Sequence, residues 1–301
     1  MSARASAPGK VLLLGEHAVV YGQPALAASL QRGVRIEVAE AAETTIVVGS
    51  PAEIAPPPEL LLAANEMAAR IGAPPRFRAV IETELPLGAG LGSSAAVGVA
   101  LARALSQLAA RQCSDERASE LALGFERHFH GAPSGVDPAI SARGGVLLFR
   151  RGDPPHVERV RARVPAYLCI ALTGIVRGTR STVLPLSDRR AARPSLYDPM
   201  LAFLGDLARG GAAALERGDL VDLGVRFDAA QGVLGALGVS CPELDDLVRL
   251  LRNASALGAK LTGAGGGGAA IALARDRDHA EAISAAVAAA GLESFVAEIG
   301  S

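Results

Sequence analysis

A glycine-rich segment that leads into an apolar helix pattern constrains the fold of this chain more than any other feature. The segment reads PLGAGLGSSAA over residues 86–96. Its glycines let the backbone approach a ligand closely, because they carry no Cβ. Ser93 and Ser94 are expected to open a helix, whose free N–H groups and positive dipole end favour a bound phosphate. The spacing fits neither a Walker A loop nor a dinucleotide-binding loop. We therefore predict a phosphate loop of another kind, with a Ser-capped glycine turn as the structural alternative.

Composition places the 301-residue chain among globular proteins with a substantial core, since half of its residues are apolar and a fifth are charged. The net charge of −1 does not indicate binding to nucleic acid or to an anionic membrane. No apolar run reaches the roughly 18 residues of a membrane span, and the N-terminus lacks the apolar core of a signal peptide. The three scattered cysteines fit neither a disulfide framework nor a zinc site, so we expect a cytoplasmic protein.

Strand and helix patterns are interleaved in both halves of the chain, which predicts an α+β fold with helices covering sheet faces. Residues 150–166 are rich in Arg, Pro and Gly and are interpreted as a boundary between domains at 1–160 and 161–301. Strands are expected at 10–14, 34–39, 44–48, 78–83, 146–149, 167–172, 259–262, 269–273 and 294–299. Helices are expected at 60–71, from 93 onward, at 115–129, several times between 179 and 257, and at 278–290.

Only two of the 30 basic residues are lysines, Lys10 and Lys260, and each lies in or beside a glycine-containing segment. An ammonium is a compact point charge that a guanidinium does not replace in a tight site. Residues 260–268 read KLTGAGGGG between two expected strands. A turn does not need so many glycines, so close approach of the backbone to a ligand is favoured over a flexible hairpin loop.

The segment ERHFHGAPSGVD (residues 126–137) places two carboxylates one short loop apart. Glu126 is expected near the end of a helix, and Asp137 is expected to open the next one. The two can serve one reaction if Glu126 holds a metal and Asp137 accepts a proton, with Lys10 keeping the base ionised. Mg²⁺ needs only one or two protein oxygens besides phosphate, so Glu126 and a serine of the glycine loop would suffice. A helix-capping Asp137 and a solvated Glu126 are the structural alternatives.

Together, PGKVLLLGEHAVVYG (residues 8–22), PLGAGLGSSAA and KLTGAGGGG resemble the three motifs of the GHMP kinases, which act on galactose, homoserine, mevalonate and phosphomevalonate. The resemblance covers nearly the whole chain and implies two α+β domains with the active site in the cleft between them. GEHAVVYG and HGAPSGVD favour the members that use mevalonate. The implied activity is ATP-dependent phosphorylation of the mevalonate C5 hydroxyl, with Mg²⁺ as cofactor. The resemblance also favours a homodimer.

The resemblance implies roles for individual residues. Asp137 matches the catalytic base, Lys10 matches the lysine that contacts it, and Ser94 and Glu126 match the ligands of Mg²⁺. The substrate pocket matches Glu16, His17 and Thr179. The phosphate loop matches Gly88, Ala89, Gly90, Leu91, Gly92, Ser93 and Ser94.

Ala132 and Pro138 depart from the family's common HGNPSGVDN pattern, which puts fine positioning in doubt more than activity. A substrate carboxylate needs a cationic clamp, and the sequence does not choose among Arg150, Arg151 and Arg177. Three other interpretations stay open. They are a GHMP kinase acting on phosphomevalonate or a sugar, a non-catalytic relative that binds a metabolite, and a purely structural α/β domain.

Overall fold

The computed structural model describes residues 2–49, 56–86, 88–129, 131, 133–175 and 179–300. Backbone contacts divide the chain into two compact units, each assembled from separate stretches. Unit 1 comprises Met1–Lys10, Gln31–Pro86 and Gly92–Gly144, and unit 2 comprises Val11–Leu30, Leu87–Leu91 and Gly145–Ser301. Both units therefore use parts of the first 31 residues. The division into consecutive domains at 1–160 and 161–301 remains a prediction.

The sheet of unit 1 combines parts of β1 (Ser2–Leu14) and β2 (Ala25–Glu40) with β3 (Thr45–Val48) and β4 (Phe77–Thr83). β4 pairs in parallel with β3 and antiparallel with β2, and β1 pairs with β2. β1 begins eight residues before the expected start at Lys10. Residues 2–9 contain no β-branched side chain, and they form a strand because β2 supplies a pairing partner.

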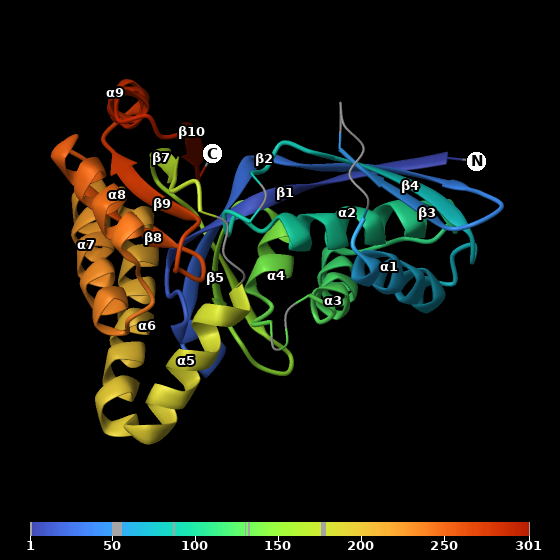
Figure 1. The fold of residues 1–301 in the computed structure, drawn as a ribbon, viewed down its shortest axis with the longest axis horizontal. Coiled ribbons are helices and arrows are strands. Elements are labelled where there is room, and N and C mark those ends of the chain that lie inside the picture. Colours follow the sequence, from blue (N-terminus) through green and yellow to red (C-terminus); the bar gives the residue numbers. More distant parts are fainter. Residues whose placement is uncertain are drawn as a thin grey trace. The chain divides into compact units, whose positions relative to one another are not determined.

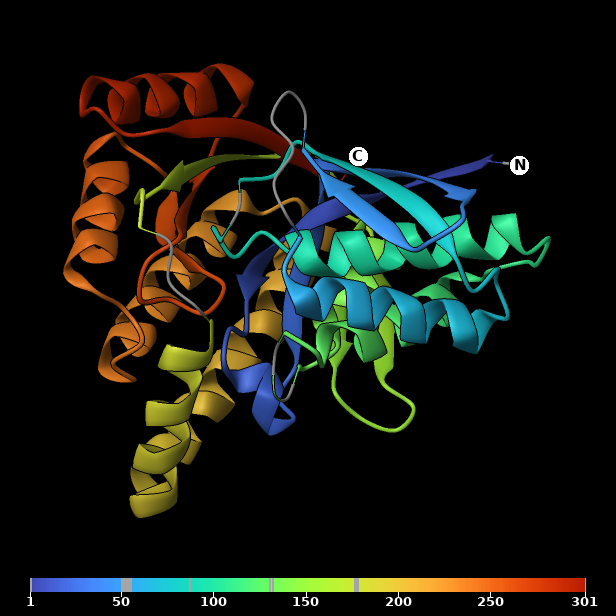
Figure 2. The same ribbon diagram turned by 45° about the vertical axis from the view of Figure 1, so that its right-hand side comes forward.

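Four helices cover one side of this sheet in Figures 1 and 2: α1 (Pro58–Ile71), α2 (Ser93–Leu108), α3 (Asp115–Glu126) and α4 (Val136–Arg143). α2 begins directly after Gly92, as predicted, and its buried face consists mainly of Ala, Val and Leu residues. α3 ends at Glu126, and α4 carries Asp137 in its first turn. Both carboxylates therefore lie at the helix ends predicted for them.

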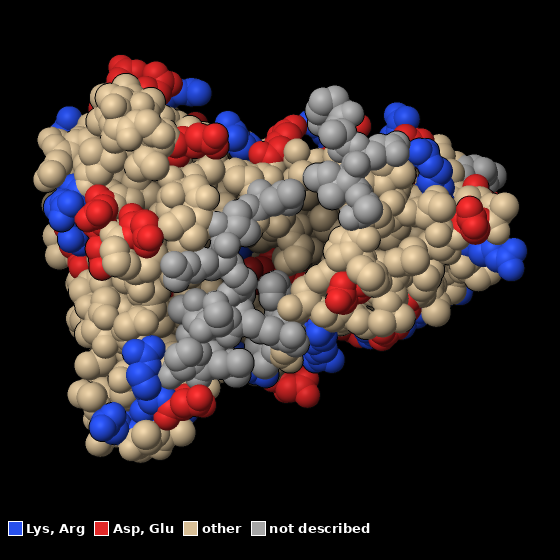
Figure 3. Space-filling view, in the orientation of Figure 1, with Lys and Arg blue, Asp and Glu red and all other residues tan. Residues whose placement is uncertain are grey.

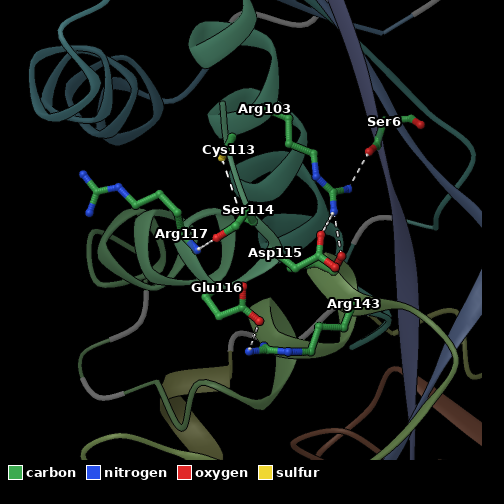
Figure 4. Close-up of polar contacts among 9 residues, drawn as sticks. Ser6, Arg103, Cys113, Ser114, Asp115, Glu116, Arg117 and Arg143 are labelled. Atoms are coloured by element: carbon green, nitrogen blue, oxygen red, sulfur yellow. Dashed lines mark hydrogen bonds and ion pairs between the residues drawn. The ribbon is translucent and has the colours of Figure 1, made fainter. Parts of the chain in front are cut away.

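Arg103 of α2 links three elements of unit 1 (Figure 4). Its guanidinium donates to the Ser6 carbonyl of β1 at 3.2 Å, to the Asp115 carboxylate of α3 at 2.7 Å and to the Ala142 carbonyl of α4 at 2.6 Å. Ser114 caps α3 by accepting from the Arg117 N–H at 3.2 Å. This network holds α4 and the start of β1 against α2.

In unit 2, β2 pairs antiparallel with β5 (Val146–Arg150), which pairs antiparallel with β6 (His156–Val160). β6 lies within residues 150–166, the segment in which the sequence predicts a boundary between domains. Four of its five residues are exposed or half-buried, and it ends the sheet. Such an edge strand lacks the apolar alternation of a half-buried strand, and only its pairing with β5 defines it.

A second sheet of unit 2 has the antiparallel order β10 (Ser294–Ile299), β7 (Ala166–Leu172), β9 (Ala269–Ala274) and β8 (Gly258–Thr262). Thr262 lies opposite Ala269, so residues 263–268 form the loop of the β8–β9 hairpin. All residues of β8 and β9 are buried. The helical elements of this unit are η1 (Ala18–Tyr21), α5 (Thr179–Ala192), α6 (Pro194–Arg217), α7 (Leu220–Ala236), α8 (Pro242–Asn253) and α9 (Arg277–Ala289).

The predicted α+β class is confirmed, because each unit combines a largely antiparallel sheet with packed helices. In the view of Figure 3, basic and acidic side chains are interspersed over the described surface rather than separated by sign. Among the described residues, no helix combines the length and the apolar character needed to cross a membrane.

Candidate active site

Lys10 of β1 and Asp137 of α4 form an ion pair inside unit 1. The Lys10 Nζ lies 3.1 Å from the Asp137 Oδ2, and the two side chains are 3 % and 28 % exposed, respectively. A buried ammonium requires a partner, and a carboxylate beside it is favoured in its ionised form. The pair thus presents a charged carboxylate that solvent or a substrate can reach. This is the juxtaposition predicted from the two sequence segments.

Gly92 lets α2 start directly against Lys10. Its φ is +76°, and a Cβ at this position would lie 2.6 Å from the Lys10 Cγ. Gly88 and Gly90 also have positive φ, at 70° and 77°. In the described structure no side chain caps the start of α2. Its first N–H groups are therefore suited to a phosphate, as expected of the loop.

Ser94 and Glu126 meet in unit 1, where the Ser94 hydroxyl donates to the Glu126 Oε1 at 3.0 Å. Glu126 is 3 % exposed. Burial, reinforced by the nearby Asp137 carboxylate, raises the pKa of Glu126 to about 8, and the Ser94 hydrogen bond and the Lys10 charge oppose the rise. The four predicted side chains Lys10, Ser94, Glu126 and Asp137 therefore form one cluster.

Glu16 and His17 form a buried turn of unit 2 just after β1. Glu16 is fully buried, and its Oε1 pairs with the Lys260 ammonium. His17 is 6 % exposed and adopts a φ of +60°, which is uncommon for a residue with a Cβ. Its Nε2 lies 3.0 Å from the Ala264 carbonyl, so this nitrogen carries the proton. The structure thus brings both residues into contact with residues 260–268, the third glycine segment.

Burial lowers the pKa of His17 to about 4, with the Arg189 charge adding to the effect and the hydrogen bond to Ala264 opposing it. Because the unfolded chain binds this proton near pH 6.5, the contribution of neutral His17 is complete above that pH and is lost as the pH falls toward 4. We expect the loss to amount to about 3 kcal/mol of unfolding free energy.

His17→Asn is the control for this expectation, because Asn tolerates positive φ and keeps an N–H donor but does not titrate. Urea unfolding of both proteins between pH 4 and pH 8 measures the difference. Parallel pH dependences for the two proteins would show that His17 is not held neutral.

The remaining candidates are less well placed. Thr179 is the first residue of α5, and its side chain lies outside the described part. Arg150 and Arg151 are exposed, and Arg151 donates to the Val20 carbonyl at 3.4 Å. Arg177 lies outside the described residues, as does Ala132. Pro138 is buried in the first turn of α4.

The many glycines of residues 263–268 have a structural explanation within unit 2. A Cβ on Gly265 would lie 2.0 Å from the Val239 carbonyl oxygen, and one on Gly268 would lie 3.1 Å from that of Ala89. A Cβ on Gly263 would lie 3.3 Å from the Gly90 carbonyl oxygen. The sequence suggested close approach to a ligand, whereas the described contacts are with neighbouring backbone, including part of the phosphate loop.

Comparison with known proteins identifies the family. The model for the GHMP kinases N terminal domain matches residues 59–145, and the model for the GHMP kinases C terminal domain matches residues 212–292. The chain belongs to the GHMP kinase family. It is therefore an ATP-dependent small-molecule kinase, and the predicted family is confirmed.

Two curated relatives and one solved structure of GHMP kinases illustrate the similarity. The chain is 39 % identical to a mevalonate kinase of Aeropyrum pernix, with 88 % of this chain and 86 % of the relative covered. It is 35 % identical to a mevalonate kinase of Pyrococcus horikoshii, with 87 % and 85 % covered. The crystal structure of L. major mevalonate kinase in complex with R-mevalonate superposes with a TM-score of 0.87 at 28 % identity, covering 98 % of this chain and 95 % of that one.

Sequence reasoning missed one residue of unit 1 and the partner of one residue of unit 2. Arg103 was not singled out, because its carbonyl partners carry no side-chain signal. Lys260 was singled out for its rarity and its place in the glycine segment, but its pairing with Glu16, 244 residues earlier, was not predicted. A single sequence contains no information that pairs such distant positions.

Proposed function

We propose that the chain transfers the γ-phosphoryl group of ATP to the C5 hydroxyl of mevalonate, giving 5-phosphomevalonate and ADP. The observation that carries the proposal is the Lys10–Asp137 pair, set beside Gly92 and the Ser94–Glu126 contact. The similarity to mevalonate kinases over most of the chain supports the choice of substrate. The presence of both charged residues argues against a non-catalytic relative.

Asp137 is proposed to accept the proton of the substrate hydroxyl as the phosphoryl group is transferred. Lys10 favours the ionised carboxylate and adds positive charge where negative charge develops. Phosphoryl transfer passes through a loose transition state, so catalysis consists mainly of positioning and charge neutralisation. The α2 N-terminus, with Gly88, Ala89, Gly90, Leu91, Gly92, Ser93 and Ser94, is proposed to bind the ATP phosphates.

Ser94 and Glu126 are proposed to hold Mg²⁺, which neutralises charge on the phosphate oxygens when bound. Both supply hard oxygen ligands, which suit this cation. Burial and the nearby Asp137 carboxylate raise the pKa of Glu126, and a cation at this position would offset both effects by favouring the ionised carboxylate. The residues present therefore fit the ion.

The substrate pocket is proposed to include Glu16, His17 and Thr179, as the family resemblance implies. A cytoplasmic location and a homodimer belong to the same proposal. The location rests on the scattered cysteines, and the homodimer rests on the family resemblance. Light scattering on the purified protein measures the oligomeric state directly.

A coupled assay of ADP release with Mg·ATP tests the activity against mevalonate, phosphomevalonate, galactose and homoserine. We expect turnover on mevalonate, with the product identified by its added phosphate mass. Preferential turnover of phosphomevalonate, galactose or homoserine would overturn the proposed substrate while leaving the kinase chemistry in place.

Ser94→Ala should weaken the use of Mg·ATP, because it removes one proposed ligand and the hydrogen bond to the other. We expect the Mg²⁺ concentration for half-maximal activity to rise by about tenfold or more, as is usual when a partner of a metal ligand is lost. Ser106→Ala removes a hydroxyl from the far end of the same helix and is the matched control. An unaltered Mg²⁺ dependence in Ser94→Ala would exclude Ser94 as a ligand.

A further inference from the structure

We infer that Lys260 is a positioning residue. Its buried ion pair with Glu16 holds the His17 turn (residues 16 and 17) against the third glycine segment (residues 260–268). The inference deepens the proposed function, on which it rests, since the His17 turn is placed there in the substrate pocket. It assigns a task to the second of the chain's two lysines.

The Lys260–Glu16 pair is completely buried, with both side chains 0 % exposed. The Lys260 ammonium also donates to the Leu261 carbonyl at 2.6 Å and lies 5.8 Å from the centre of the Phe227 ring. The second oxygen of Glu16 is buried and has no hydrogen-bond partner among the described residues. Lys260 therefore provides the side-chain charge that neutralises Glu16.

Such a pair is poorly explained by stability alone. Removing two charges from water is expensive, and replacing a buried ion pair by well-packed apolar side chains is often neutral or stabilising. An ion pair does, however, fix one relative placement of two segments. We therefore interpret this pair as a device that determines geometry.

Two neighbouring contacts join the same segments. The Thr262 hydroxyl accepts from the Leu12 N–H at 3.2 Å and donates to the Leu12 carbonyl at 2.9 Å. His17 contacts the Ala264 carbonyl at 3.0 Å. Glu16 lies between Leu12 and His17 in the sequence, and Lys260 lies two residues before Thr262. Three side-chain contacts thus hold the end of β1 and its turn to β8 and the loop that follows.

Of the residues in these contacts, His17 is the most sensitive to loss of the Lys260–Glu16 pair, because it directly follows Glu16 and adopts an uncommon φ of +60°. A residue in a sparsely populated conformation persists only when its surroundings determine it. Without the ion pair, the turn is expected to relax, and the ring of His17 would leave the position that its hydrogen bond to Ala264 defines.

The test is a double-mutant cycle of Lys260→Met, Glu16→Gln and the combined variant in the full-length protein. Each single variant should lower the midpoint of unfolding, and the combined variant should recover it because no unpaired buried charge remains. The KM for mevalonate should be raised by up to about 100-fold in Lys260→Met, which leaves the proposed pocket residue Glu16 unchanged, and should stay raised in the combined variant. This is the size of effect that a small misplacement produces. Arg277→Met, which removes an exposed charge paired with Glu281, is the matched control.

Nuclear magnetic resonance titration of His17 gives a second readout that does not depend on turnover. The ring pKa of about 4 should move toward 6.5 in the combined variant. A combined variant with recovered stability, a normal KM and an unchanged His17 titration would overturn the positioning role. Absence of mevalonate turnover in the unmodified protein would instead contradict the proposed function, and the titration would still decide the role of Lys260.

Discussion

Asp137→Asn is expected to lower kcat by about 10²- to 10⁴-fold, the usual contribution of a general base. Asn keeps the size of the side chain but cannot accept a proton from the substrate hydroxyl. The change leaves every residue of the loop proposed to bind phosphate in place, so ATP binding should stay close to that of the unmodified protein. Steady-state kinetics and a direct nucleotide-binding titration measure the two effects separately.

Asp206→Asn provides the comparison for Asp137→Asn, because Asp206 pairs with Arg209 on the surface of α6 and has a 64 % exposed side chain. Its kinetic constants should match those of the unmodified protein. If Asp137→Asn retained kcat within a factor of a few, the carboxylate would be a structural partner of Lys10 and another group would accept the proton.

Lys10→Met should lower kcat by about 10²- to 10³-fold, the range found when one preorganised electrostatic group is removed from an active site. The ammonium pairs with Asp137 and opposes the rise in the pKa of Glu126. Its loss should therefore also raise the Mg²⁺ concentration needed for activity. Rates measured across a range of Mg²⁺ concentrations separate the two effects.

Lys10→Arg restores the charge and tests whether charge alone is sufficient. We expect little recovery, because the Lys10 side chain is 3 % exposed and lies against Gly92, and a planar guanidinium does not replace a compact ammonium in a tight site. Full recovery would show that the site needs only a positive charge near Asp137. It would also show that the scarcity of lysine in this chain has no bearing on this position.

The local features of the candidate site could be predicted because short-range rules determine them. A glycine turn follows from residues without a Cβ at positions 88, 90 and 92, and the start of α2 follows from the apolar periodicity after them. Asp137 begins a helix for the same local reasons. The contact between Asp137 and Lys10, in contrast, was inferred from chemistry and from family resemblance, since 127 residues separate them in the sequence.

The features that could not be predicted depend on tertiary partners. β6 is a strand because β5 lies beside it, and its own residues are mostly exposed and carry no apolar alternation. The burial of Glu16 depends on Lys260, and neither residue type indicates a core position by itself. The glycines of residues 263–268 reflect neighbouring carbonyl groups that no sequence pattern reveals.

The assembly of unit 2 from both ends of the chain determines when its buried contacts can form during synthesis. Leu12 and Thr262 are separated by 250 residues, and Glu16 and Lys260 by 244. At about 5–20 residues per second, roughly 10–50 s pass on the ribosome between the two members of each pair. During that time the Glu16 carboxylate stays hydrated, because its buried partner does not yet exist. The segment of residues 8–22 is therefore among the first parts of the chain to be made and among the last to reach its final environment.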